Sequence, residues 1–175
     1  NKVKIIFFDI DGTLLEMGKT EITPNMRKAL CSLKQNGIKI CIATGRPFVT
    51  IPMFEGVVFD AILAFNGSFC VAGEQVVAKC PIPKEDVKKI IENAKRMERP
   101  VSIATAEEIV ANGSDKDLED YFAIAHHRVN VSEKFEEYVE KDVFQIMLGC
   151  DLEERKYILE GTKNAKLAAW WDRAI

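Results

Sequence analysis

The sequence predicts an α/β fold, in which a partial doubly wound parallel sheet is followed by a second α/β unit. Three apolar runs of strand length and one helical pattern alternate over residues 1–65, which is typical of parallel sheets. After residue 80 the elements become shorter and more antiparallel in character. We therefore expect one domain over residues 1–81 and a second over residues 82–175.

The elements of the first domain follow from periodicity and turn residues. The apolar run at residues 3–8 suits a strand that is buried on both faces. Thr23-Pro24 is typical of a helix start, and Asn36 is typical of a helix end. Two further strands are predicted at residues 38–43 and 61–65, and a hairpin at residues 68–71 and 75–80.

The second domain opens with a helical pattern at residues 84–96, whose apolar side chains recur on one face. Its charges alternate along the sequence, as on a solvated helix face. The rest of this domain mixes strand-like runs with short amphipathic stretches. We predict strands at residues 101–105, 108–111, 143–149 and 166–171, and helices at residues 116–122, 133–140 and 152–159.

Composition narrows the classes of function. The formal net charge is −3 and no basic run is present, so we expect no nucleic-acid partner. The longest apolar stretches have strand length, well short of the ~20 residues that span a bilayer, so we expect no membrane segment. The five cysteines show no CxxC spacing, which favours reduced thiols in a cytoplasmic protein. Oligomeric state stays open.

A polar cluster follows each strand of the predicted parallel sheet. The clusters lie at residues 9–13, 44–46 and 66–67. Functional groups in open α/β sheets collect beyond the carboxyl ends of the strands. We therefore expect the three clusters to converge at one edge of the sheet.

Asp9 and Asp11 are the candidate catalytic pair. Two carboxylates just beyond a buried strand are costly unless a cation, hydrogen bonds or raised pKa values compensate. Mg²⁺ with oxygen ligands is the usual solution beside phosphate, and one carboxylate can attack phosphorus while the other transfers protons. Gly12 permits a tight turn, whose backbone amides near Thr13 can meet phosphate oxygens. A solvated acidic turn is the plainer interpretation, and the preceding apolar strand argues against it.

These segments resemble a known superfamily. Residues 9–14 (DIDGTL) resemble the first motif of the haloacid dehalogenase superfamily. Residues 42–47 (IATGRP) resemble the second motif of its Cof-like sugar-phosphate phosphatases, the type IIB subfamily, and residues 66–67 (NG) resemble the next marker of that branch. The resemblance implies a Rossmann-like core sheet for the first domain. It implies an α/β cap, which closes over the site and selects the substrate, for residues 82–175.

The resemblance also implies a role for each matched residue. Asp9 would be the nucleophile and Asp11 the general acid–base. The Asp9 carboxylate and the Asp11 main-chain carbonyl would be ligands of Mg²⁺. The second motif would bind the transferring phosphoryl group through its threonine hydroxyl and glycine amide. The residues implied in phosphate or substrate binding are Gly12, Thr13, Thr44, Gly45, Arg46 and Asn66.

The chain departs from the superfamily pattern after the cap. The third motif supplies a lysine and the fourth supplies a further metal-binding acid, and neither is visible before Ile175. Residues 149–151 are a poor substitute, because their context suggests a strand-to-helix turn inside the cap. The chain therefore resembles the superfamily as far as the cap and looks truncated after it. We expect the 175-residue chain by itself to have little or no phosphatase activity, and a longer protein to be active.

The leading hypothesis is a Mg²⁺-dependent phosphatase, a phosphomonoester hydrolase that cleaves small phosphorylated metabolites such as sugar phosphates. It would act through an aspartyl-phosphate intermediate on Asp9. The alternative is a noncatalytic or truncated regulatory domain that binds phosphoryl groups and Mg²⁺ without turnover, for which the missing motifs argue. A phosphomutase or transferase would use the same intermediate, but the large insertion after Cys80 argues against it.

Overall fold

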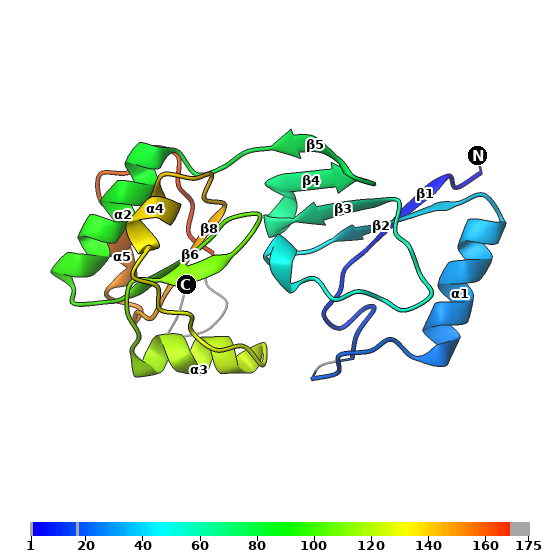
Figure 1. The fold of residues 1–175 in the computed structure, drawn as a ribbon, viewed down its shortest axis with the longest axis horizontal. Helices are drawn as coiled ribbons and strands as arrows, with labels where there is room; N and C mark the ends of the chain where they lie inside the picture. Colours follow the sequence, from blue (N-terminus) through cyan, green and yellow to red (C-terminus); the bar gives the residue numbers. More distant parts are fainter. Residues whose placement is uncertain (1, 17, 169–175) are drawn as a thin grey trace. The chain divides into compact units, whose positions relative to one another are not determined.

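The fold is described by a computed structural model, which covers residues 2–16 and 18–168. The chain divides into two compact units, Asn1–Cys80 and Pro81–Ile175, each with its own sheet and its own apolar core (Figure 1). The predicted α/β class is confirmed. None of the helices in the described part of the chain combines the length and apolar composition that crossing a membrane requires.

The first unit contains a five-stranded mixed sheet with the order β1-β2-β3-β4-β5. The first three strands run parallel and the last two form an antiparallel hairpin, so the predicted parallel start and the predicted hairpin are both confirmed. The strands are β1 (Ile5–Phe8), β2 (Lys39–Ala43), β3 (Ala61–Ala64), β4 (Phe69–Ala72) and β5 (Gln75–Lys79).

The prediction that β1 is buried on both faces is wrong for the described chain. Ile5 and Phe7 are 45% and 50% exposed, and among the described residues β1 pairs only with β2, at the edge of the sheet. The strand also begins at Ile5 rather than at residue 3, because its first partner is Lys39, the residue at which β2 starts. An edge strand has a neighbour on one side only, so its apolar composition does not by itself guarantee burial.

Helix α1 (Pro24–Gln35) crosses from β1 to β2 and has the predicted ends. The Thr23 hydroxyl accepts a hydrogen bond from the Met26 amide at 3.2 Å, Pro24 occupies the first turn, and the helix closes at Asn36. Its buried face packs into the core of this unit. The buried members of that core are Ile10, Leu14, Leu15, Ile22, Leu30, Ile40, Ile42, Phe54 and Val57.

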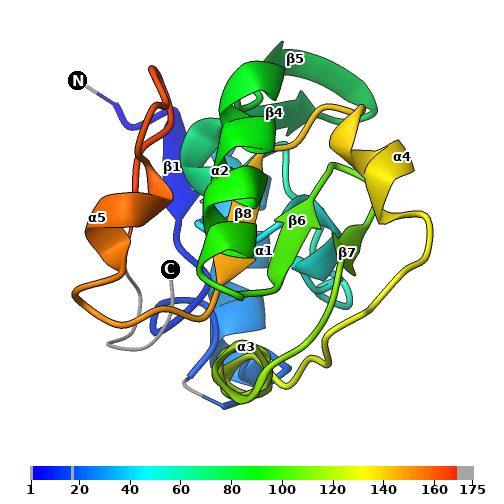
Figure 2. The same cartoon turned by 90° about the vertical axis from the view of Figure 1, so that its left-hand side faces the viewer.

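The second unit contains a three-stranded antiparallel sheet with the order β7-β6-β8. Its strands are β6 (Val101–Ala104), β7 (Ile109–Ala111) and β8 (Gln145–Leu148). Helix α2 (Lys84–Arg96) lies over this sheet (Figure 2) and contributes Val87, Ile90 and Ala94 to the core. Every residue of β6 is buried, because it is the central strand.

Three shorter helices complete the second unit: α3 (Lys116–Ile124), α4 (Phe135–Val139) and α5 (Arg155–Ile158). The last two are shorter than the predicted segments at residues 133–140 and 152–159, because turns occupy their ends. The predicted strand at residues 166–171 is not formed over residues 166–168. The rest of it lies outside the described residues.

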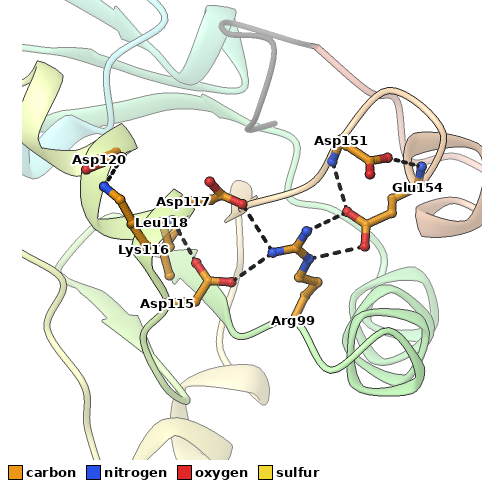
Figure 3. A network of polar contacts seen from close by, with 8 residues as sticks. All are labelled: Arg99, Asp115, Lys116, Asp117, Leu118, Asp120, Asp151 and Glu154. Carbon is orange, nitrogen blue, oxygen red and sulfur yellow. Dashed lines mark hydrogen bonds and ion pairs between the residues drawn. The ribbon is translucent and has the colours of Figure 1, made fainter.

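Arg99 joins three parts of the second unit (Figure 3). Its guanidinium donates to Glu154 at 2.8 and 3.2 Å, to Asp117 at 3.2 Å and to Asp115 at 3.4 Å. Asp115 also caps α3 by accepting from the Leu118 amide at 2.8 Å. One cation therefore ties the chain after α2 to the start of α3 and to the turn before α5.

Asp86 makes a second polar joint, at the first turn of α2. Its carboxylate is buried and accepts hydrogen bonds from the amides of Lys163, Asn164 and Ala165 at 2.8 to 3.0 Å. The Lys163 and Asn164 amides lower the pKa of this carboxyl most strongly, and burial opposes them in part. The joint fixes the segment after α5 to the start of α2.

Candidate active site

The loop that follows β1 presents Asp9 and Asp11 to solvent while it buries its apolar residues. Ile10 is fully buried, and Leu14 and Leu15 are nearly so. The loop also closes on itself, with the Gly12 amide donating to Leu15 O and the Leu15 amide donating to Ile10 O, both at 2.8 Å. Gly12 has φ +80°, a conformation that favours glycine. Buried leucines thus hold the two aspartates in place.

The loop that follows β2 carries Thr44, Gly45 and Arg46. Thr44 is buried, its amide donates to Leu63 O at 2.9 Å, and its hydroxyl oxygen accepts from the Arg46 amide at 3.2 Å. Among the residues that the structure describes, neither the Thr44 hydroxyl proton nor the Gly45 amide has an acceptor. Both donors are therefore available to an anion.

The turn that follows β3 holds Asn66 beside the second loop. Phe65, Asn66 and Gly67 all have positive φ, of 50°, 55° and 90°, which is uncommon for a bulky side chain such as Phe65. The Asn66 amide donates to Thr44 O at 3.0 Å, and the Phe65 amide donates to Arg46 O at 3.1 Å. Such strain persists where the surroundings enforce it, and here a buried phenyl ring and two hydrogen bonds do so.

Arg46 connects the second loop to the first. Its guanidinium makes bidentate hydrogen bonds to the Asp11 carboxylate, with Nε donating to Oδ2 at 2.8 Å and Nη2 donating to Oδ1 at 2.6 Å. These hydrogen bonds raise the pKa of the Arg46 guanidinium, burial partly opposes the rise, and the charges of Asp11 and Asp9 add to it. The three predicted clusters therefore do converge, through contacts between Asp11 and Arg46 and between Asn66 and Thr44.

The residues present suit part of a magnesium site. The Asp9 carboxylate is exposed at the end of β1, and the Asp11 carbonyl lies in the same loop; both are the hard oxygen donors that Mg²⁺ prefers. The side-chain oxygens of Asp11 are taken by Arg46. No group of three or more His, Cys, Asp or Glu residues that could hold a metal occurs within residues 2–16 and 18–168. Among the described residues, the Asp9 carboxylate and the Asp11 carbonyl would supply two ligands of an octahedral set.

Two features of this site were not predicted from the sequence. The Asp11–Arg46 pair joins residues 35 positions apart, and no local pattern signals such a contact. The strain at Phe65 was also missed, although an aromatic residue directly before Asn-Gly at a strand end is a usable signal.

Other sequence features have structural roles. Residues 149–151 form the predicted strand-to-helix turn, in which the Asp151 carboxylate accepts from the Glu153 and Glu154 amides at 2.9 and 2.8 Å. His126 and His127 lie in an exposed turn after α3. All five cysteines are free. Trp170 and Trp171 lie outside the described residues.

Fold and site together define an α/β protein that carries an aspartate pair after the first strand and a threonine-containing loop after the second. Residues 6–171 match the haloacid dehalogenase-like hydrolase family, and the chain belongs to that family.

Named relatives are phosphatases by description. "Putative phosphatase YkrA" of Bacillus subtilis is 31% identical over 156 residues, which is 87% of this chain and 60% of YkrA. A crystal structure from work on a trigonal-bipyramidal intermediate in a phosphoryl-transfer superfamily matches with a TM-score of 0.83 and 28% sequence identity. The match covers 99% of this chain and 68% of the chain in that structure. The structure of the HAD subclass IIB sugar phosphatase BT4131 matches with a TM-score of 0.77 and 28% sequence identity. The match covers 98% of this chain and 68% of the BT4131 chain.

The present chain thus spans 60% of the length of YkrA and 68% of the length of each of the two solved structures.

Proposed function

We propose that the protein to which this chain belongs is a Mg²⁺-dependent phosphomonoesterase that acts in the cytoplasm on small phosphorylated metabolites, such as sugar phosphates. The observation that carries the proposal is the exposed Asp9–Asp11 pair. It stands on a loop anchored by buried leucines and is linked through Arg46 to the loop with the free Thr44 and Gly45 donors.

The reaction is written in two steps. A carboxylate oxygen of Asp9 attacks phosphorus, the bond to the leaving oxygen breaks, and Asp11 gives its proton to that oxygen. Asp11 then takes a proton from water, whose oxygen attacks phosphorus and releases phosphate and the free Asp9 carboxylate. The Thr44 hydroxyl and the Gly45 amide hold the phosphoryl oxygens throughout. Gly12, Thr13 and Asn66 are further contacts to phosphate or substrate.

The Asp9 carboxylate and the Asp11 carbonyl would hold Mg²⁺, which when bound offsets the charge of the phosphate beside the nucleophile. The second unit, residues 82–175 in our proposed division, serves as the cap, which excludes water from the phosphoenzyme and selects the metabolite.

The test is hydrolysis of an aryl phosphate by the whole protein, with and without Mg²⁺. Asp9→Asn removes the nucleophile and is expected to lower kcat by about a thousandfold or more. Asp11→Asn is expected to lower it by about a hundredfold to ten-thousandfold, because proton transfer is lost. Glu16→Gln, in the same loop, is the matched control and should leave the rate unchanged. Full activity in Asp9→Asn would rule out the proposed nucleophile.

A second candidate applies to the 175-residue chain by itself, as a domain that binds phosphoryl groups without turnover. The incomplete set of acidic ligands in the described residues favours it. Titration calorimetry with orthovanadate and Mg²⁺ on this chain checks it. Binding without hydrolysis supports this candidate, and hydrolysis at a rate abolished by Asp9→Asn contradicts it.

A further inference from the structure

The pairing of Arg46 with Asp11 has a consequence for the order of events at the site. Both oxygens of the Asp11 carboxylate accept hydrogen bonds from the Arg46 guanidinium, at 2.8 and 2.6 Å. Bidentate arginine–carboxylate pairs are among the stronger and more directional contacts in proteins. A carboxylate held in this way has one lone pair of each oxygen committed to Arg46, so the guanidinium competes with any other partner for it.

The main chain of Arg46 is fixed by hydrogen bonds, whereas its guanidinium lies at the end of a long side chain with several rotatable bonds. Its amide donates to the Thr44 hydroxyl at 3.2 Å and its carbonyl accepts from Phe65 at 3.1 Å, so the main chain is fixed. Its Nη1 donates to Thr50 O at 3.3 Å, a longer contact than the fork to Asp11. The Thr50 amide and hydroxyl in turn both donate to Pro47 O, at 2.9 and 2.8 Å. The long side chain can therefore change partner without movement of the loop.

A phosphate group offers Arg46 a second acceptor of the same kind. Phosphate carries more charge than a carboxylate and also accepts two parallel N–H bonds from a guanidinium. The free Thr44 hydroxyl and Gly45 amide place the anion-binding donors in the residues directly before Arg46. A phosphate bound to those donors lies within the range of the Arg46 side chain and competes with Asp11 for it.

We propose that Arg46 is a positioning residue with two partners: it pairs with the Asp11 carboxylate until substrate binds and then transfers to the substrate phosphate, which frees Asp11 for catalysis. This inference rests on the proposed phosphatase function. It links substrate binding to release of the acid–base group: once Asp11 leaves the guanidinium, it takes up from solvent the proton that it then gives to the leaving oxygen.

The direct test follows the Arg46 side chain by NMR in the whole protein, with ¹⁵N-labelled arginine and inorganic phosphate plus Mg²⁺ as the probe. The Nε–H signal is assigned through its loss in Arg46→Lys. We expect it to shift in Asp11→Asn, which removes the present partner, and to move to a different position when phosphate saturates the wild-type site. An Nε–H signal that stays fixed while calorimetry shows phosphate binding would overturn the transfer and leave the phosphatase proposal intact.

Steady-state kinetics distinguish an Arg46 that transfers to phosphate from an Arg46 that stays paired with Asp11 throughout the reaction. If Arg46 transfers to phosphate, Arg46→Gln raises KM by about tenfold or more, the loss of a charged hydrogen bond, while kcat changes little. Arg46→Lys keeps the charge without the fork and should recover part of the affinity. A fall in kcat at unchanged KM would mean that Arg46 braces Asp11 throughout, which overturns the proposal. If the whole protein neither hydrolyses aryl phosphates nor binds phosphate, the proposed function itself fails, and this inference with it.

Discussion

Two arginines, one in each unit, satisfy their charge in different ways. Arg99 in the second unit contacts three carboxylates, each about one quarter exposed, and is itself 23% exposed. Arg46 in the first unit contacts one carboxylate that is 48% exposed. The first arrangement gives the guanidinium four hydrogen bonds and joins three elements, whereas the second leaves the pair open to solvent and to a competing anion. The difference separates a structural joint from a site that can exchange partners.

The largest effect on stability is expected at Arg99. Arg99→Met keeps the aliphatic stem but leaves Glu154, Asp115 and Asp117 as neighbouring, partly buried anions, so we expect a loss of about 2–3 kcal/mol in the free energy of unfolding. Urea unfolding followed by circular dichroism measures it. Lys116→Met is the control, because its pair with Asp120 is solvent-exposed and contributes about 0.5 kcal/mol or less. Equal losses in the two variants would contradict the structural role of Arg99.

The next effect tests how closely this joint is packed. A Cβ at position 149 would lie 2.5 Å from Asp117 Cβ and 3.2 Å from Asp115 Oδ1. Gly149→Ala must therefore displace the start of α3, and we expect a loss of about 1–3 kcal/mol. Gly113→Ala is the matched control, since its new Cβ would meet only Pro100 Cβ, at 3.3 Å. A neutral Gly149→Ala would show that α3 shifts without cost.

Asp86 differs from the carboxylates around Arg99, because its hydrogen bonds come from backbone amides and not from an arginine. Its pKa is lowered in the folded protein, so its contribution is fully present above the unfolded pKa of about 3.9. That contribution disappears as the pH falls through the lower, folded value.

Thermal unfolding from pH 7 to pH 2 should show wild type more stable than Asp86→Asn at neutral pH, with the gap closing below about pH 4. Glu85→Gln, at the exposed neighbouring position, serves as the control and should show a much smaller gap. If the difference in stability between wild type and Asp86→Asn stayed constant down to pH 2, ionisation of the Asp86 carboxyl would not contribute to stability.

The smallest effect on stability is expected at Arg46. Arg46→Met breaks a pair whose carboxylate is nearly half exposed, so the free energy of unfolding should change by about 1 kcal/mol or less. The same urea experiment as for Arg99→Met makes the comparison direct. A loss as large as that of Arg99→Met would show that the pair is a structural joint, and the contrast between the two units would disappear.

Much of the fold followed from local pattern. Apolar runs and turn residues located the strands of both sheets to within a few residues, and Thr23-Pro24 marked the start of α1. Short helices were less predictable, because α4 and α5 have only one or two turns and depend on packing more than on propensity. The exposure of Ile5 and Phe7 goes with the place of β1 at the edge of the sheet, which the apolar composition of the strand does not reveal.

By itself the sequence predicted the class of protein, which is confirmed, and proposed the residues of the candidate site. The reason is that strand ends and their polar clusters are local features, and in a parallel sheet such ends necessarily share one edge. Only the tertiary structure decided that Arg46 pairs with Asp11, that Phe65 adopts a strained conformation and that Arg99 pairs with three carboxylates. Each of these depends on loops brought together from distant parts of the chain, and no periodicity in the sequence encodes which side chains then meet.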